Sequence, residues 1–401
     1  MNLILFVGII LTLGCFVGRI THALKITGVV GYLMAGIILG PSVFGITNVL
    51  GISEEVFSVF WNSIVYFTLA LIAFIIGAHL TLVLIRELGK PVIAIILGES
   101  LGAFLFVLVG VYLYTQNLSE ALFLASLAPA TAPAGTIAIL HEYRAKGPLT
   151  NALLEIVGFD DALAILIFVI GIAAVKISLG GVISFSTVFV IPAKEIFGGL
   201  ALGAILGLLL ASVIKKIKER ESMFIASLGA ILVGAGLANI LGFSLILTCM
   251  GIGMVFINLI PTRGKAPLEM IEGFMAPLYV LFFAVAGVAL RLDLLYTAGI
   301  IGVLYVVFRI IGKIFGTSFS AKITRAPRIF QKYLGFALFS QAGVQLGLVA
   351  LAGSILAPLP GGKELAALGL TIVIATTIVF QIIGSVGVRL ALTRAGETTK
   401  V

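Results

Sequence analysis

Recurring apolar runs of membrane-spanning length are the feature that most constrains this chain. Runs of about 20 apolar residues, the length that crosses a bilayer, recur from one end of the 401-residue sequence to the other. Hydrophobic residues make up 61% of the chain and charged residues only 10%. A soluble domain carries about 25% charged residues. The sequence therefore predicts an all-α polytopic membrane protein, in which helices satisfy every backbone polar group within the hydrocarbon.

The apolar runs predict about thirteen transmembrane helices, each long enough to cross a hydrocarbon core of about 30 Å. Their approximate limits are 2–19, 26–41, 56–80, 90–114, 119–141, 150–175, 194–214, 222–241, 243–260, 273–290, 297–321, 333–356 and 366–388.

Basic residues are concentrated in every second gap between the predicted spans. One set of gaps holds most of the 25 basic residues, including the clusters at 215–220 and 322–332. The other set holds only Lys176, Lys194, Arg291 and Lys363. Cytoplasmic loops carry the excess of Lys and Arg in membrane proteins. We therefore predict a cell-membrane protein with its N-terminus outside and its C-terminus in the cytoplasm. The positive-inside rule then accounts for the net charge of +8, so this charge does not predict a nucleic-acid partner.

An odd number of spans predicts an inverted repeat, in which six spans and a linker span precede six spans of opposite sense. We place the first repeat, spans 1–6, in residues 1–175 and the linker span in residues 176–221. The second repeat, spans 8–13, then covers residues 222–401. In this scheme the fifth span corresponds to the twelfth.

The fifth and twelfth spans both contain residues that interrupt a helix at mid-depth. The fifth contains Pro129, Ala132 and Pro133, and the twelfth contains Gln341 and Gly343. Interrupted helices in corresponding positions of two halves indicate a transporter binding site. The alternative is a proline kink with ordinary packing of small residues.

Five charged residues are expected near the middle of the bilayer. At 1.5 Å per residue, Asp160 and Asp161 lie about 15 Å deep, Glu99 about 14 Å, Arg309 about 18 Å and Lys313 about 12 Å. A charge in hydrocarbon costs roughly 2.5 kcal/mol or more, so such residues are usually functional. The alternative is that all five form structural ion pairs between helices.

Adjacent carboxylates point about 100° apart on a helix, so Asp160 and Asp161 cannot perform the same task. One can bind a cation while its neighbour faces a base. Arg309 and Lys313 share one helix face. Lys313 is the better candidate for a titrating partner, because a buried lysine loses its proton readily, and Arg309 is the better static counter-charge. The hydroxyl of Thr131 and the opened backbone around it offer oxygen ligands that suit a hard monovalent cation.

Several of these stretches resemble the monovalent cation/proton antiporters, specifically the second branch with its double-aspartate sodium/proton antiporters. The resemblance covers essentially the whole chain. Its motifs are Ala-Thr-Ala-Pro-Ala at 130–134, the segment 141–150, Phe-Asp-Asp-Ala at 159–162, and the segments 31–41, 308–313 and 341–347.

The resemblance implies a homodimer that works by an elevator mechanism. A core domain from spans 4–6 and 11–13 would contain two crossed broken helices, and the other spans would form a dimerisation or scaffold domain. It implies that Asp161 binds the cation and the proton in competition. Asp160, its neighbour in this transient sodium site, would pair with the base of the eleventh span, Arg309 or Lys313. Glu99 matches a glutamate that some members of the other branch use at the ion site.

One position departs from the pattern of the family. Many members carry an acidic residue after the threonine, where this chain has Ala132. In those members the acid caps the broken helices, so another group must neutralise the helix ends here.

We therefore predict a secondary active sodium (or lithium)/proton antiporter that is electrogenic, contributes to pH homeostasis and needs no cofactor. A potassium/proton antiporter or potassium efflux system of the same fold is the nearest alternative. An organic-anion/sodium symporter would need a larger polar cavity. An intramembrane aspartyl protease, the enzyme alternative, would need a second catalytic aspartate, and no other predicted span contains one.

Overall fold

The computed structural model describes residues 2–23, 28–41, 43–83, 89–132, 136–137, 139–140, 143–180, 190–290 and 295–398. Every regular element within these ranges is a helix, and none of them is a strand. The prediction of an all-α protein is confirmed.

The helices agree with the predicted spans. Within the described residues, nine helices are long and apolar enough to cross a membrane, and one bent helix pair would make a tenth. The predicted spans that remain coincide with shorter apolar helices, which are α2 (Gly28–Leu39), α7 (Leu118–Leu127) and α12 (Leu245–Leu259). The chain is thus a multi-span membrane protein.

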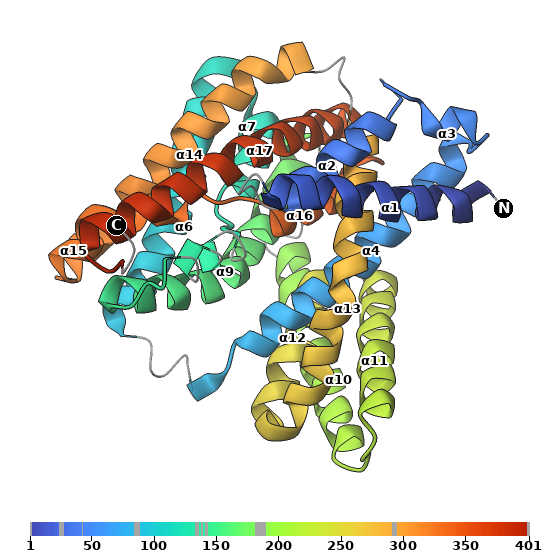
Figure 1. Cartoon of the computed structure of the whole chain (residues 1–401), viewed down its shortest axis with the longest axis horizontal. Helices are drawn as coiled ribbons and strands as arrows, with labels where there is room; N and C mark the ends of the chain where they lie inside the picture. Colours follow the sequence, from blue (N-terminus) through green and yellow to red (C-terminus); the bar gives the residue numbers. More distant parts are fainter. Residues whose placement is uncertain are drawn as a thin grey trace. The chain divides into compact units, whose positions relative to one another are not determined.

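The chain divides into two compact units (Figure 1). The first unit comprises Met1–Asn62, Leu88–Leu179 and Val280–Val401, and the second comprises Ser63–Glu87 and Gly180–Tyr279. Two helices contribute to both units, α4 (Glu54–His79) and α13 (Pro261–Val288).

Each unit has its own set of helices. The second unit also contains α10 (Ile191–Ile214), α11 (Arg220–Leu241) and α12. The first unit also contains α1 (Asn2–Ala23), α2, α3 (Ile46–Val49), α6 (Lys90–Thr115), α7, α9 (Pro148–Ser178), α14 (Leu295–Ile323), α15 (Arg328–Tyr333), η3 (Leu334–Leu338), α16 (Gly343–Leu356) and α17 (Gly362–Ala395). All the spans assigned to the predicted core domain therefore lie in the first unit, while the boundary between core and scaffold stays a prediction.

Helices α6 and α14 pack backbone to backbone through glycines spaced four residues apart. A side chain on Gly316 would overlap the carbonyl oxygen of Gly98, and one on Gly312 would overlap the carbonyl oxygen of Gly102. Small residues at this spacing let membrane helices approach closely. Because Glu99 follows Gly98 and Lys313 follows Gly312, the same contact brings an acid and a base together.

A second kind of glycine contact occurs once in each of the two units. In the first unit, spans two and ten (α2 and α13) meet where glycines face carbonyl oxygens. In the second unit, spans nine and three (α12 and α4) meet in the same way. The pairs are Gly36 with Ala284, Gly287 with Leu33, Gly253 with Phe74 and Gly77 with Met250.

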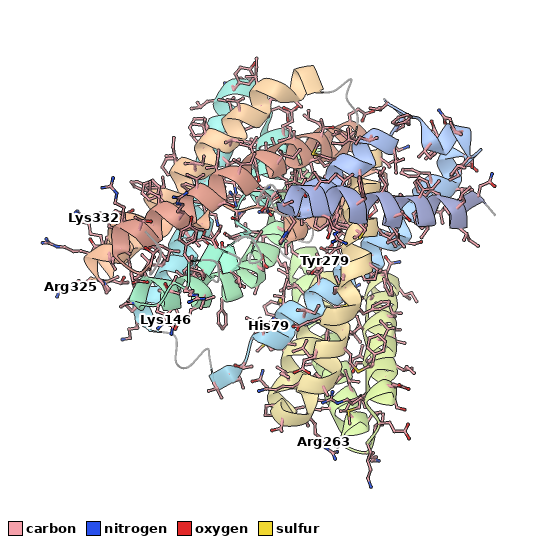
Figure 2. All side chains as sticks on the ribbon, viewed as in Figure 1. His79, Lys146, Arg263, Tyr279, Arg325 and Lys332 are labelled. Carbon is pink, nitrogen blue, oxygen red and sulfur yellow. The ribbon has the colours of Figure 1, made fainter. Side chains whose placement is uncertain are left out.

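Basic residues from two predicted cytoplasmic gaps lie at the same end of the first unit. Figure 2 shows Lys146 at the start of α9, and Arg325 and Lys332 beside and within α15, all at this end. They belong to gaps that are far apart in the sequence, which the positive-inside rule assigns to one side of the membrane.

Glu397, which follows α17, holds the start of α9. Its carboxylate accepts from the backbone N–H of Leu149 and of Thr150, each at 2.8 Å, and from the Thr150 hydroxyl at 2.7 Å. The first N–H groups of a helix have no partner within the helix, and a carboxylate there is also favoured by the helix dipole. The C-terminal segment thereby anchors the helix that carries Asp160 and Asp161.

We expect Gly316→Ala to lower the thermal unfolding midpoint in detergent. The new methyl group would meet the backbone of α6, which cannot move aside cheaply, and overpacking of this kind costs about 1–3 kcal/mol. Gly299→Ala in the same helix is the matched control, because no heavy atom lies within 4 Å of the added carbon. Equal stability of the two variants would contradict the close packing of α6 and α14.

Glu397→Ala removes the cap of α9 and should also lower the unfolding midpoint. Loss of a helix cap with its favourable charge costs about 1–2 kcal/mol. Glu364→Ala, at an exposed position in the first turn of α17, serves as the control. If the two variants unfold at the same temperature, Glu397 does not stabilise α9.

Candidate functional site

Both predicted helix interruptions are present in the described residues. Helix α7 ends at Leu127, and residues 130–132 that follow are not helical. In the twelfth span, η3 ends at Leu338 and α16 begins at Gly343, with a bend of 53° between the two parts. Gln341 lies in the non-helical segment between them. Pro133 lies outside the described residues.

The two interruptions meet each other inside the first unit. The backbone N–H of Ala132 donates to the carbonyl of Ser340 at 3.0 Å. The Gln345 side chain donates to the Ala130 carbonyl, and its own oxygen accepts from the N–H of Ala342 at 3.3 Å. Backbone groups opened by one interruption are thus partly satisfied by the other, as buried irregular backbone in a membrane requires.

Arg309 connects the carbonyl ends of both interrupted helices. Its guanidinium donates to the carbonyls of Ala128 and Ala130 at 2.8 Å and to that of Phe339 at 2.7 Å. It also lies over the ring of Phe380, 4.4 Å from the ring centroid. Carbonyls at a helix C-terminus carry a partial negative charge, which a cation stabilises. Arg309 thus offsets the partial negative charge of these carbonyl ends.

Lys313, one turn further along α14, contacts the acids. Its ammonium group forms an ion pair with Glu99 and lies 3.5 Å from Asp160 Oδ2. It also donates to the carbonyl of Pro129 and, at 2.9 Å, to the hydroxyl of Thr131. The base in contact with Asp160 is therefore Lys313. The hydrogen bonds that Arg309 makes to described residues go to backbone carbonyls.

Ser100 lies between the two acids that contact Lys313. Its hydroxyl oxygen is 2.6 Å from Glu99 Oε1 and 3.0 Å from Asp160 Oδ1. Glu99, Ser100, Asp160 and Lys313 are all fully buried. Sequence reasoning missed Ser100, because its role depends on the contact between α6 and α9 and its only signal was its position next to Glu99.

Asp161 differs from its neighbour in forming no ion pair within 4.0 Å with a described residue, whereas Lys313 lies 3.5 Å from Asp160. Its side chain is 4% exposed, and its Oδ1 atom makes no hydrogen bond to a described residue. Asp160 Oδ2 likewise has no hydrogen bond to a described residue, although Lys313 lies near it. An unsatisfied buried acceptor costs about 1–3 kcal/mol, more when it is charged. Two adjacent residues therefore each present an oxygen that is able to take a proton or a cation.

Other polar groups support the interruption of the twelfth span. Gln341 Nε2 donates to the hydroxyl of Tyr305 at 3.1 Å, and Gln381 Nε2 donates to the Gln341 carbonyl at 2.8 Å. Tyr305 and Gln381 were not predicted as site residues. Tyr305 precedes Arg309 by four residues, one turn of the same helix face, and that spacing is the signal that could have identified it.

A cluster of classical metal ligands is not part of the described site. Among the residues that the structure describes, no group of three or more His, Cys, Asp and Glu side chains is arranged to hold a metal ion. A cation bound at Asp160 and Asp161 would need hydroxyl or carbonyl oxygens to complete its coordination. The hydroxyl of Thr131 belongs to the same cluster, because it accepts a hydrogen bond from Lys313, which also lies beside Asp160.

Arg309→Lys should destabilise the junction of the interrupted helices even though it keeps the charge. An ammonium group lacks the planar fork of a guanidinium, so it cannot reach all of the carbonyls. Each buried carbonyl left without a partner costs about 1–3 kcal/mol, which the unfolding midpoint in detergent would report. Arg389→Lys is the control, since Arg389 is exposed and lies over the ring of Tyr143. Unchanged stability of the Arg309 variant would contradict the capping role.

Comparison with known proteins gives one family and a set of solved structures. A family model described as "Sodium/hydrogen exchanger, transmembrane" matches residues 7–389. The structure of the sodium proton antiporter MjNhaP1 from Methanocaldococcus jannaschii at pH 8 has a TM-score of 0.76 at 18% identity, covering 99% of this chain and 98% of that one. An electron-microscopy structure of the same antiporter has a TM-score of 0.69 at 19% identity, covering 98% of this chain and 96% of that one. No curated protein matched the sequence.

Proposed function

The chain belongs to the sodium/hydrogen exchanger family, and from that premise we propose that it is a secondary active antiporter that exchanges sodium or lithium ions for protons. The family and the structural neighbours are transporters, so an intramembrane protease is not supported. The fold shared with a solved sodium proton antiporter supports the proposal.

The observation that carries the proposal is that Asp161 is buried and that its Oδ1 atom makes no hydrogen bond to a described residue. A carboxylate on a buried stretch of a membrane helix, with an oxygen that no described group satisfies, has a strong affinity for positive charge. Asp160 presents a second such oxygen beside it. A proton and a monovalent cation therefore compete for the same atoms. With Thr131 and the carbonyls of the interrupted helices, these atoms form the ligand set that we propose for a hard cation.

Competition between the proton and the cation leads to their exchange if the binding site moves across the membrane only when one of them is bound. We propose that the core domain, made of spans 4–6 and 11–13, moves as one body against the remaining spans, in an elevator mechanism within a homodimer. The close packing of α6 against α14 supports movement of the charged cluster as a unit, because both helices belong to that core. The basic residues at one end of the first unit support an N-terminus outside and a C-terminus in the cytoplasm.

The two buried bases, Lys313 and Arg309, have different tasks. Lys313 offsets the charge of Glu99 and Asp160, and Arg309 stabilises the interrupted backbone that surrounds them. We propose that the exchange is electrogenic, with more protons than cations moved in each cycle, and that it serves pH homeostasis at the cell membrane. Potassium/proton exchange by the same site is the second candidate, since carboxylate and hydroxyl oxygens also suit potassium. Proton flux driven by sodium, lithium and potassium in turn, measured in proteoliposomes, distinguishes these cations.

Asp161→Asn should abolish cation-driven proton flux in proteoliposomes, because the amide cannot take up and release the proton that is exchanged for the cation. Asp160→Asn should reduce the flux or weaken its dependence on membrane potential. Glu55→Gln, an exposed change in the first turn of α4, is the control and should transport normally. Near-normal flux in the Asp161 variant would refute the assignment.

A further inference from the structure

Exposed basic residues cover the end of the first unit where α14 stops and α15 begins. Lys322 lies in the last turn of α14, Arg325 in the turn that follows, and Arg328 and Lys332 in α15. All four residues are exposed, and none of them forms an ion pair with a carboxylate of a described residue. The sequence contains no Asp or Glu from residue 294 to residue 363. We call these four residues the basic surface.

The positive-inside rule does not account for the basic surface by itself. The predicted cytoplasmic gap at 215–220 also has four basic residues, but Glu219 lies among them and Glu221 follows directly. Other predicted cytoplasmic gaps hold only two basic residues, as at 86–90, 144–146 and 263–265. Because loop orientation requires only an excess of Lys and Arg, four uncompensated charges in one short segment indicate an additional use.

The backbone at Arg325 supports the same conclusion. Helix α14 ends in two hydrogen bonds, from the Ala326 N–H to the Ala321 carbonyl at 2.8 Å and from the Arg325 N–H to the Lys322 carbonyl at 3.1 Å. Arg325 itself has a φ of 55°, in the left-handed region. Glycine normally occupies this position at the end of a helix, because a side chain there is strained. The chain therefore keeps an exposed guanidinium where the backbone favours glycine.

Helix α15 presents its charges outward because its other face is buried. Phe330 is only 7% exposed, whereas Arg328 and Lys332, four residues apart, share the exposed face. The helix contacts α14 and α17. Figure 2 shows Arg325 and Lys332 projecting from this end of the unit. Because α15 lies between the eleventh and twelfth predicted spans, it is expected at the level of the lipid headgroups.

An exposed apolar stripe on α14 leads to the basic surface. Phe315, Phe319 and Ile323 follow one another at four-residue intervals and are 53%, 55% and 65% exposed. Residues at this spacing lie on one side of a helix. The rings of Phe315 and Phe319 are stacked, with centroids 5.6 Å apart. The stripe ends beside Lys322, so a ligand that joins an apolar chain to a negative charge can contact both features.

We propose that the basic surface and this stripe form a docking site for an anionic phospholipid. Its phosphate accepts hydrogen bonds from the basic side chains, and Arg325 and Arg328 offer planar forks that fit phosphate oxygens. An acyl chain lies along Phe315 and Phe319. Clusters of basic residues next to a transmembrane helix attract anionic headgroups in this way. The lipid thereby holds the end of α14, the helix that carries both buried bases.

The test is the stabilisation of the purified full-length protein by lipid in a neutral detergent. Phosphatidylglycerol should raise the unfolding midpoint of the wild type, whereas phosphatidylcholine of the same chain length should leave it unchanged. Arg325→Gln/Arg328→Gln removes two of the four charges, each worth about a fivefold change in affinity. The phosphatidylglycerol concentration that gives half of the stabilisation should therefore rise roughly 30-fold.

Lys216→Gln/Lys218→Gln is the matched control, because these exposed lysines belong to another predicted cytoplasmic gap, in the second unit. This variant loses the same charge and should keep the wild-type response to phosphatidylglycerol. An equal loss of response in the two double variants would show a general attraction between a basic protein and anionic lipid, and would overturn the docking site. An unchanged response of the Arg325 and Arg328 variant would also overturn it.

Two further measurements distinguish the lipid from a soluble anion. Inorganic phosphate and glycerol phosphate should not stabilise the wild type, and stabilisation equal to that by phosphatidylglycerol would refute a lipid ligand. Phe319→Ala should weaken the response severalfold, whereas Val303→Ala, an exposed apolar change elsewhere on α14, should not. Equal responses of these two variants would contradict the role of the stripe. None of these readouts involves transport, so failure of this inference leaves the antiport function intact.

Discussion

The buried ion pair between Lys313 and the acids Glu99 and Asp160 is the constraint on which the rest of the structure depends. Charges in a hydrocarbon layer persist only when partners neutralise them. The glycines of α6 and α14 allow the two helices to approach closely enough for Glu99 and Lys313 to meet. Helix α9 then brings Asp160 to the same ammonium group. In the proposed mechanism, the compensated pair beside Asp161 leaves that acid available for exchange.

The interrupted helices are tolerated because side chains replace the missing backbone hydrogen bonds. Arg309 binds carbonyls of both interruptions, and Gln345 links the second interruption to the first. These bonds separate the roles of the two bases of α14. One turn apart on the same face, Arg309 serves the backbone and Lys313 serves the carboxylates. Arg309 stabilises the carbonyl ends, whereas an acid at the position of Ala132 would act on the positive N-terminal ends of the interrupted helices.

The sequence was sufficient for the spans, the interruptions and the layer of charged residues, because hydrophobic length and the cost of burying charge act locally along the chain. It was not sufficient for choosing between Arg309 and Lys313 as the partner of Asp160, since both lie on one helix face. Ser100 and Glu397 also escaped prediction. Their partners lie 60 and 247–248 residues away, and only the packing of α9 against α6 and against the end of α17 brings them together.

The central claim is that a cation and protons compete for the oxygens of Asp160 and Asp161. The most direct measurement is the apparent affinity for the cation as a function of pH, taken from transport currents in proteoliposomes at saturating and limiting cation concentrations. Competition predicts that the cation concentration for half-maximal current rises steadily as the proton concentration rises, while the maximal current at saturating cation stays constant. A half-maximal concentration that does not change with pH, together with a maximal current that falls on acidification, would show that protons act at a different site and would contradict the account.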